Sequence, residues 1–329
     1  MREGSDSSAL AELRFLAMGT QITVTVIGEK SETVEAHAAV AEIRILMAEF
    51  GHDFWAWGSG RLASLNRELA QGGVINIPPD MRELFARAWQ ARLATGGMFE
   101  PRIGQLVKLW GFDDIRKPGS QPPDVIAISR LLALLRDAPG YDGSANYGPA
   151  PGVAWDFGGI GKGYIVDRTL ELLANRGFDN ALIDAGGNLA ARGSRGDRPW
   201  CVGIRDPRSP SGTQRLIAAL LIGDESVVTH GDDQRYFEHA GERYAHVLDP
   251  ATGRPMKGLR SLTIVHADAT RADAEGAAIY ASGPSRWRSL AERLGFDQVL
   301  AVLESGEVLA TPALARRLLL HKGVEIGVV

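Results

Sequence analysis

Apolar and polar positions alternate along some segments of this chain and recur at helical spacing along others. The stretch FLAMGTQITVTVIG, residues 15–28, alternates as a β-strand does, whereas residues 31–49 repeat apolar positions at helical spacing. Further helical patterns cover residues 59–70, 79–95, 124–136 and 161–176. Short strand patterns then follow one another at 180–186, 200–206, 215–222, 225–230, 243–249 and 261–267.

The C-terminal part adds helical patterns at 270–283 and 285–295 and a hairpin near 297–310. Strands that succeed one another through tight connections favour an antiparallel or mixed sheet over a doubly wound parallel one. We therefore predict an α+β fold, with helices packed on a mixed or antiparallel sheet core.

The length of 329 residues allows one large domain or two smaller ones. We predict a single domain over residues 1–329, in which residues 1–14 form a flexible N-terminus. The Pro- and Gly-rich stretches at 116–123 and 138–152 are typical of surface loops, and the first of them marks a subdomain boundary.

The composition excludes several classes of function. A hydrophobic content of 45% and a charged content of 23% are ordinary for a globular protein, and a net charge of −4 favours neither nucleic acid nor anionic lipid. The single cysteine, Cys201, excludes an internal disulfide and a cysteine-based metal cluster. No apolar run is long enough to insert into a membrane. The N-terminal residues lack a signal-peptide core and a lipid-anchor cysteine, so the chain as written is expected in the cytoplasm, or in the periplasm if an export segment precedes it.

The segment DFGGIGKGYIVDR, residues 156–168, combines four glycines with Lys162 and suggests a phosphate site. It is not a Walker P-loop, because Asp156 stands where the first glycine belongs and Gly163 replaces the Ser or Thr after the lysine. The dinucleotide fingerprint does not fit either. A strand–turn–helix corner in which the glycines serve only the turn is the alternative interpretation.

Two further segments contain aromatic residues beside glycines. In TGGMFEPRIGQLVKLWGF, residues 95–112, two glycines precede Met98, Phe99 and Glu100, which suits either an aromatic ligand or a capped helix with a core aromatic. In HDFWAWGSG, residues 52–60, Trp55 and Trp57 would lie on the same side of an extended segment and could stack a ring system or pack into the core.

Two acidic and histidine-containing segments offer chemistry. YAHVLDPATGRP, residues 244–255, places His246 three residues before Asp249, which suits a general base or a turn cap. TRADAEGAAIYASG, residues 270–283, is expected to open a helix with Asp273 in its first turn, where an acid complements the helix dipole or holds magnesium.

Taken together and in this order, these segments resemble the FAD:protein FMN transferases, the ApbE-type flavin transferases. The resemblance runs from about Phe15 to the final helix. It is carried by MGTQITVTV, GMFEPRIGQLVKLWGF, DFGGIGKGYIVDR, ALIDAGGNLAARG, SVVTHGDDQRYF and HVLDPATGRP. The resemblance implies an ApbE-like fold related to the T-fold, FAD as donor, and Mg²⁺ on the FAD pyrophosphate. It also implies an acceptor protein, an electron-transfer subunit of a redox complex, whose Thr or Ser hydroxyl receives FMN while AMP leaves.

The resemblance also assigns roles to individual residues of this chain. His246 corresponds to the histidine at the reacting phosphate, and Asp273 and the carbonyl of Gly159 correspond to magnesium ligands. Trp55 or Trp57 takes the place of a tyrosine near the flavin. The remaining residues assigned to the flavin nucleotide are Met18, Met98, Phe99, Glu100, Asp156 and Lys162.

The residue types agree with this chemistry. Attack of an alcohol on a pyrophosphate needs charge neutralisation, which Mg²⁺ and Lys162 supply, and a histidine of pKa near 6.5 acts as a base without tuning. Two positions depart from the family pattern. Ala277 stands where a threonine is usual in the metal segment, and His230 occupies the serine position of the usual Thr-Ser-Gly. We expect the missing hydroxyl to weaken magnesium binding.

Three functions are compatible with these residues. The first is flavin transfer to a protein acceptor. The second is flavin binding or maturation without transfer, and the third is hydrolysis of FAD to FMN and AMP with water in place of the acceptor hydroxyl. The sequence is compatible with a monomer or a homodimer.

Overall fold

The computed structural model describes residues 10–114, 119–209, 215–232 and 235–329. Within these residues the main sheet has nine strands in the order β1-β2-β5-β6-β9-β14-β15-β16-β18. Every pairing between neighbours is antiparallel except the last, β16 with β18, which is parallel. The predicted α+β fold with a mixed or antiparallel sheet is confirmed.

The strands of the main sheet are β1 Ala11–Ala17, β2 Thr20–Ile27, β5 Asn180–Ala185, β6 Asn188–Arg192, β9 Ser226–Gly231, β14 Leu259–His266, β15 Val299–Leu303, β16 Val308–Ala310 and β18 Gly327–Val328. The other strands form small sheets. One has three strands, with β8 Leu216–Ile222 between β7 Trp200–Arg205 and β17 Leu319–Leu320. The others are pairs: β3 Ile75–Asn76 with β4 Asn146–Tyr147, β10 Tyr236–His239 with β11 Glu242–Ala245, and β12 Leu248–Asp249 with β13 Arg254–Pro255.

The helices are η1 Lys30–Glu32, α1 Thr33–Asp53, α2 Arg61–Ala70, α3 Arg82–Ala94, α4 Gly104–Leu109, α5 Val125–Asp137, α6 Gly161–Asn175, α7 Ala269–Ala281, α8 Trp287–Leu294 and α9 Pro312–Ala315. In the part of the chain that is described, no helix is long and apolar enough to cross a membrane.

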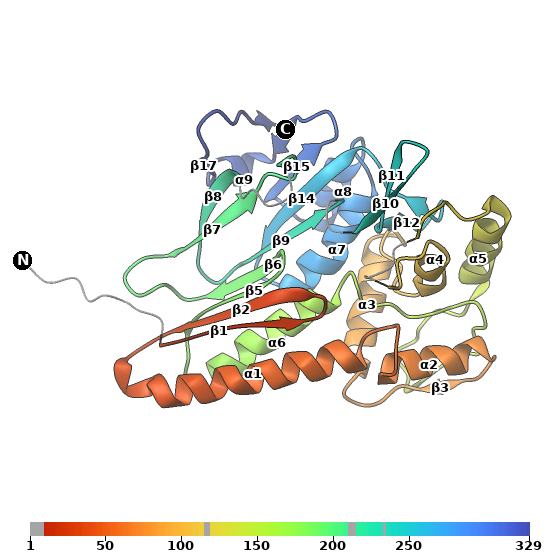
Figure 1. Cartoon of the computed structure of the whole chain (residues 1–329), viewed down its shortest axis with the longest axis horizontal. Helices are drawn as coiled ribbons and strands as arrows, with labels where there is room; N and C mark the ends of the chain where they lie inside the picture. Colours follow the sequence, from red (N-terminus) through yellow and green to blue (C-terminus); the bar gives the residue numbers. More distant parts are fainter. Residues whose placement is uncertain (1–9, 115–118, 210–214, 233–234) are drawn as a thin grey trace, which may run out of the picture.

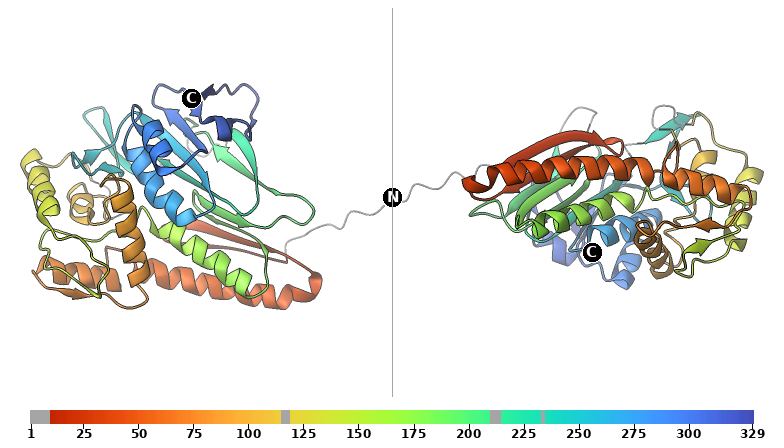
Figure 2. Two further views of the ribbon diagram at one scale, coloured as in Figure 1. Left: turned by 180° about the vertical axis from the view of Figure 1, so that it is seen from behind. Right: turned by 90° about the horizontal axis from the view of Figure 1, so that it is seen from below.

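The two faces of the main sheet are covered by different layers. Helices α6, α7 and α8 lie over one face, and α1 runs beside the β1–β2 hairpin (Figures 1 and 2). Because side chains alternate along a strand, Val228 and Ile264 belong to the core under the helices while Val227 and Val265 belong to a second core. That second core is shared with the small sheet of β7, β8 and β17.

Helices α2, α3, α4 and α5 gather at one end of the main sheet, to the right in Figure 1. Helix α3 contacts α7, so the helical part joins the sheet at the ends of α6 and α7. Two of the segments singled out in the sequence, 156–168 and 270–283, meet at this junction, where Gly163 of α6 donates to Asp273 of α7.

Three sequence predictions need correction. The segment 15–28 is not one strand, because Met18 and Gly19 form the turn of a hairpin between β1 and β2. The predicted strand 243–249 is interrupted at His246, between β11 and β12. Residues 11–14, expected to be flexible, belong to β1, while residues 1–9 lie outside the described part. The predicted boundary at 116–123 lies partly outside it too and stays a prediction.

Candidate active site

The loop from Asp156 to Ile160 leads into α6 and is held in place from two sides. The side chain of Asn66, on α2, both donates to the carbonyl of Trp155 and accepts from its N–H, each at 2.8 Å. The N–H of Asp156 donates to the carbonyl of Pro101 at 2.7 Å. The phosphate-like segment is therefore fixed on the helical part of the molecule before the helix begins.

Helices α6 and α7 cap one another. The Oδ2 of Asp273, on α7, accepts from the N–H of Gly163 in the first turn of α6 at 2.9 Å. Asp167, on α6, accepts from the N–H groups of Ala269 at 3.1 Å and Thr270 at 2.8 Å. Gly163 permits this close packing, since a Cβ there would overlap the carbonyl of Ala269. Each helix thus satisfies N–H groups that the other would leave free.

The position of Asp273 differs from the prediction. The N-cap of α7 is Asp268, whose side chain accepts from the N–H of Arg271 at 2.7 Å, and the first turn contains no other acid. Asp273 lies one turn further along and is 1% exposed. It therefore does not cap its own helix, and its carboxylate faces the start of α6.

The capping of Gly163 by Asp273 has a consequence for Gly159. In a regular helix the N–H of Gly163 would bond the carbonyl four residues earlier, which is that of Gly159. Among the described residues nothing donates to the Gly159 carbonyl, and nothing donates to the second oxygen of Asp273. Two oxygen acceptors are thus left free at the start of α6.

These two oxygens are of the kind that bind a metal ion, and a magnesium ion at Asp273 and Gly159 stays a prediction. A Cβ built on Gly159 would lie 3.7 Å from the Cβ of Ala277 and 3.3 Å from the ring of Phe99, so the structure brings these three positions together. Carboxylate and carbonyl oxygens suit Mg²⁺, and the departure at Ala277 removes a hydroxyl at this place. Across the described ranges, no three His, Cys, Asp or Glu side chains are grouped as a metal site.

Lys162 lies in the first turn of α6, half-buried. A cation is unfavourable at this end of a helix because the helix dipole is positive there, and the first turn of α6 has no acid to balance it. Burial is the largest cause that lowers the pKa of His230 and of His246, and the charge of Lys162 lowers both further, so the lysine acts on both rings. An anion would be stabilised at this place by both the lysine and the helix.

His246 lies between β11 and β12 and is oriented by Arg235. Its ring Nδ1 is 3.2 Å from the carbonyl of Arg235, which also accepts from the main-chain N–H of His246 at 3.1 Å. Because a carbonyl only accepts, Nδ1 carries the proton and Nε2 carries the lone pair. Burial, followed by the charge of Arg235, lowers the pKa of His246 to about 4. The expected pKa near 6.5 is therefore wrong for the free protein, and the imidazole is neutral at pH 7.

Asp249 is not the partner of His246. Its carboxylate accepts from the N–H of Ala251 at 2.9 Å and from the hydroxyl of Thr252 at 3.1 Å. Of the two alternatives for this motif, the acid caps the turn. The histidine is held by a main-chain carbonyl instead.

The carboxylate of Asp156 interacts electrostatically with Arg235, the residue that also acts on His246. This carboxylate accepts from the N–H of Gly158 at 2.9 Å, and burial raises its pKa although that hydrogen bond and the charge of Arg235 oppose the shift. The structure thus brings Asp156, Lys162, His246 and Asp273 together from loops and helices far apart in the sequence. His230 joins them, since the charge of Asp273 also acts on its pKa.

His230 fits only because of a neighbouring glycine. Its Nε2 lies 3.3 Å from the carbonyl of Ala272, and a Cβ on Gly276 would come within 2.6 Å of the same nitrogen. His230 and Gly276 are therefore matched to each other in packing. Burial lowers the pKa of His230.

Met18 is held in an unusual backbone conformation. It has a φ of 51° and Gly19 a φ of 72°, as the two residues of a tight hairpin turn require. Its side chain packs against Gly51 near the end of α1, where a Cβ would lie 3.1 Å from Cγ of Met18. A non-glycine residue in this region is strained, and such strain is often found at ligand sites.

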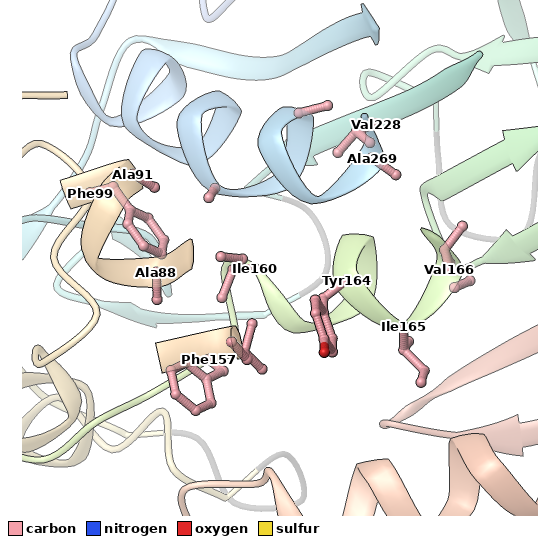
Figure 3. Close-up of a cluster of buried hydrophobic side chains, with 14 of the residues drawn as sticks. Ala88, Ala91, Phe99, Phe157, Ile160, Tyr164, Ile165, Val166, Val228 and Ala269 are labelled. Atoms are coloured by element: carbon pink, nitrogen blue, oxygen red, sulfur yellow. The ribbon is translucent and has the colours of Figure 1, made fainter. Parts of the chain in front are cut away.

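Of the two aromatic segments, only residues 95–112 reach the junction between the helical part and α6. Phe99 is buried with Ala88 and Ala91 of α3, beside Ile160 at the start of α6 (Figure 3). Met98 is half-buried against the same core. Gly96 and Gly97 have φ of 64° and 85°, and a Cβ added to either would have no atom of the described residues within 4 Å, so their surroundings are open.

Trp55 and Trp57 do not lie in an extended segment, because α1 continues to Asp53 and bends follow it. Trp55 is 44% exposed and lies over Gly58, while Trp57 packs against the main core. The two indoles therefore do not form the paired surface that an extended segment would give. A role of either ring at a flavin stays a prediction.

The side chain of Glu100 is held by two arginines in the interior. Its carboxylate accepts from Nε of Arg92 at 2.6 Å and from Nε and Nη2 of Arg102 at 2.8 and 2.9 Å. Both guanidinium groups also lie over the ring of Trp89, at 4.6 and 4.8 Å. Burial opposes ionisation, but the hydrogen bonds and charges of Arg102 and Arg92 lower the pKa of Glu100. A contact of this side chain with the flavin nucleotide stays a prediction.

We expect Glu100→Gln to lower the free energy of unfolding by about 3–5 kcal/mol, because the side chain of Arg102 is only 2% exposed and would lose its charged partner. Chemical denaturation measures this change. Glu292→Gln is the control, since its pair with Arg288 is exposed and contributes about 0.5 kcal/mol or less. Equal changes in the two variants would show that the Glu100 cluster is not structural.

Sequence reasoning missed Asn66, Asp167 and Arg235. Asn66 and Asp167 act on main-chain groups 89 and 102 residues away, respectively, and no local pattern announces such pairings. Arg235 lies in the stretch SVVTHGDDQRYF, one of those that carry the family resemblance. The arginine in it could have been named as a candidate for binding an anion.

The chain is similar to known proteins of one family. The model of the ApbE family matches residues 18–302. A FAD:protein FMN transferase of Rhodobacter capsulatus is 31% identical over 94% of this chain, which spans 62% of that relative's length. One from Treponema pallidum is 32% identical over 82% of this chain and 77% of its own.

Two solved structures are also similar. The ApbE protein of Thermotoga maritima has a TM-score of 0.82 and 28% identity, covering 93% of this chain and 98% of its own. The apo form of the flavinyl transferase ApbE of Pseudomonas stutzeri has a TM-score of 0.77 and 25% identity, covering 93% and 96%.

Proposed function

This chain belongs to the ApbE family, and we propose that it is a FAD:protein FMN transferase, which moves FMN from FAD to a hydroxyl of an acceptor protein. The observation that carries the proposal is the neutral His246, whose Nδ1 is committed to Arg235 and whose Nε2 is free, beside the cation Lys162. A free base next to a fixed cation suits proton removal at a phosphate.

The reaction follows from this arrangement. The Ser or Thr oxygen of the acceptor attacks the FMN-side phosphorus, a new O–P bond forms, and the P–O bond to AMP breaks. Nε2 of His246 takes the hydroxyl proton, and AMP leaves with the electron pair of the broken bond. Lys162 stabilises the charge on the phosphoryl oxygens in the transition state.

The low pKa of His246 is compatible with this role because of its causes. Burial is the largest, and the charges of Arg235 and Lys162 add to it. The pyrophosphate of FAD is an anion, so its binding offsets both cationic charges and raises the basicity of Nε2. His246 therefore becomes a stronger base when the substrate is bound.

The free acceptors at the start of α6 fit the magnesium ion that the family resemblance implies. Asp273 and the carbonyl of Gly159 would hold it, and a bound Mg²⁺ would supply positive charge at the pyrophosphate oxygens. With Ala277 in place of a hydroxyl residue, the protein offers few ligands, and the substrate and water provide the rest. The flavin end of FAD would reach Met18, Met98 and Phe99. The acceptor would be an electron-transfer subunit of a redox complex.

Release of AMP separates transfer from the other two functions. The full chain is incubated with FAD and Mg²⁺, with and without a candidate flavin-acceptor domain, and AMP is measured by chromatography. We expect AMP only when the acceptor is present. Equal amounts of AMP and free FMN without acceptor would show a hydrolase, and FAD that binds but stays intact in both samples would show a flavin-binding protein.

A further inference from the structure

Arg235 is hydrogen-bonded to the candidate base His246, and its side chain has no assigned role in the proposed transfer reaction. It directly precedes β10, and its carbonyl holds both the main-chain N–H and the ring Nδ1 of His246. The main chain of Arg235 therefore cannot shift without moving His246. Burial is the largest influence on the pKa of His246 and of Asp156, and the charge of the Arg235 side chain also acts on both.

The guanidinium of Arg235 is half-buried and lacks an acceptor among the described residues. In that part of the chain it makes no hydrogen bond or ion pair, whereas Arg260 nearby pairs with Asp232 at 3.0 Å. Five N–H donors without acceptors in a partly buried place are unfavourable. Burial lowers the pKa of Arg235, and the charge of Asp156 opposes that shift without forming an ion pair. The side chain thus has unused capacity to bind an anion.

The charges around Arg235 indicate which anion would fit. Its charge acts on His246 and on Asp156, and Lys162 acts on the same histidine. Two cations, one on α6 and one directly before β10, therefore act on the candidate base. A planar guanidinium suits two oxygens of a phosphate group, whereas an ammonium acts as a point charge.

We propose that Arg235 is a further substrate-binding residue, whose guanidinium binds the pyrophosphate of FAD at the phosphate where His246 acts. This inference rests on the proposed function. Arg235 has two roles in it: the carbonyl fixes the tautomer of His246, and the guanidinium holds the phosphate in front of Nε2. The second role belongs to the side chain alone, so substitution tests it without removing the carbonyl.

Binding of three ligands to the full chain tests this role. FAD and ADP contain a pyrophosphate, whereas riboflavin does not. The dissociation constants of all three ligands are measured by calorimetry at fixed salt and Mg²⁺ concentrations. For Arg235→Gln we expect about 10–100-fold weaker binding of FAD and ADP, with riboflavin affinity changed by about twofold or less. Arg235→Lys should fall between wild type and Arg235→Gln, because the charge remains but the fork geometry is lost.

Arg243→Gln is the matched control. Arg243 lies on β11, in the hairpin that Arg235 directly precedes, but its guanidinium carbon is 4.0 Å from the ring centroid of Tyr236 and its Nη2 is 3.5 Å from Glu238. It should bind all three ligands as wild type does. Unchanged affinity of Arg235→Gln for FAD and ADP would overturn the inference, as would an equal loss for riboflavin accompanied by reduced thermal stability.

Failure of the proposed function looks different. A wild-type protein that binds ADP through Arg235 but binds neither flavin would contradict flavin transfer and leave the anion site standing. A wild-type protein that binds none of the three ligands would overturn both.

Discussion

Replacing His246 with alanine is expected to lower the rate of FMN transfer by about 10²–10⁴-fold, while FAD affinity changes little. Nδ1 of this ring donates to the carbonyl of Arg235, and Nε2 makes no hydrogen bond with any described residue. Without it no side chain takes the hydroxyl proton, so the loss falls on kcat. Steady-state kinetics with an acceptor domain and a separate FAD titration measure the two quantities.

His239→Ala is the control, because this histidine on β10 is exposed and its ring Nδ1 lies 3.2 Å from the carbonyl of Ser120. It should transfer at the wild-type rate. If His246→Ala kept wild-type turnover per folded molecule and lost only thermal stability, His246 would be a structural residue rather than the base.

The pH profile of the wild type follows from the same pKa. A general base is active when deprotonated, so the rate falls as pH falls through its pKa. For the free protein that pKa is about 4, and kcat/KM should therefore stay level from pH 8 down to about pH 5. The pKa seen in kcat should be higher, because bound FAD offsets the charges of Lys162 and Arg235.

Asp273→Asn is expected to reduce transfer by at least about 10²-fold at any practical Mg²⁺ concentration. The asparagine oxygen still accepts from the N–H of Gly163, so the capping of α6 is retained while the metal-binding charge is lost. Rates measured against Mg²⁺ concentration, with thermal unfolding as the check on folding, separate these effects. Asp273→Ala loses both the cap and the charge and should be inactive and less stable.

Ala277→Thr is the opposite change at the same place. It adds a hydroxyl beside Gly159, where the family pattern has one, and should lower the Mg²⁺ concentration that gives half-maximal rate. Full activity of Asp273→Asn in excess EDTA would contradict the metal assignment. An unchanged Mg²⁺ requirement in Ala277→Thr would show that its hydroxyl does not reach the ion.

The sequence predicted most regular elements because their signals are local. Apolar spacing gave α1, α2, α3, α5 and α6 close to their observed bounds, and serial strands gave the antiparallel sheet. The hairpin at Met18 was missed since its turn uses methionine at positive φ instead of the usual Asn or Gly. A methionine held there by packing against α1 depends on tertiary structure, which apolar spacing does not record.

For the candidate site, the structure shows which predicted residues lie together, while their roles stay predictions. Lys162, His246, Asp156 and Asp273 do converge, yet the partner of His246 is a carbonyl eleven positions away instead of Asp249. The role of Asp273 at α6 depends on the packing of two helices. Glu100 was assigned to the flavin from the family resemblance, and that role stays a prediction; no signal in the sequence indicated that two arginines bind its carboxylate in the interior.

The intact mass of an acceptor domain, measured after incubation with the full chain, FAD and Mg²⁺, tests the proposed transfer most directly. We expect an acceptor heavier by one FMN less one water, with an equal amount of AMP, for the wild type and not for His246→Ala over the same time. An acceptor of unchanged mass, whether FAD remains intact or is split to free FMN and AMP, would contradict the proposed transfer.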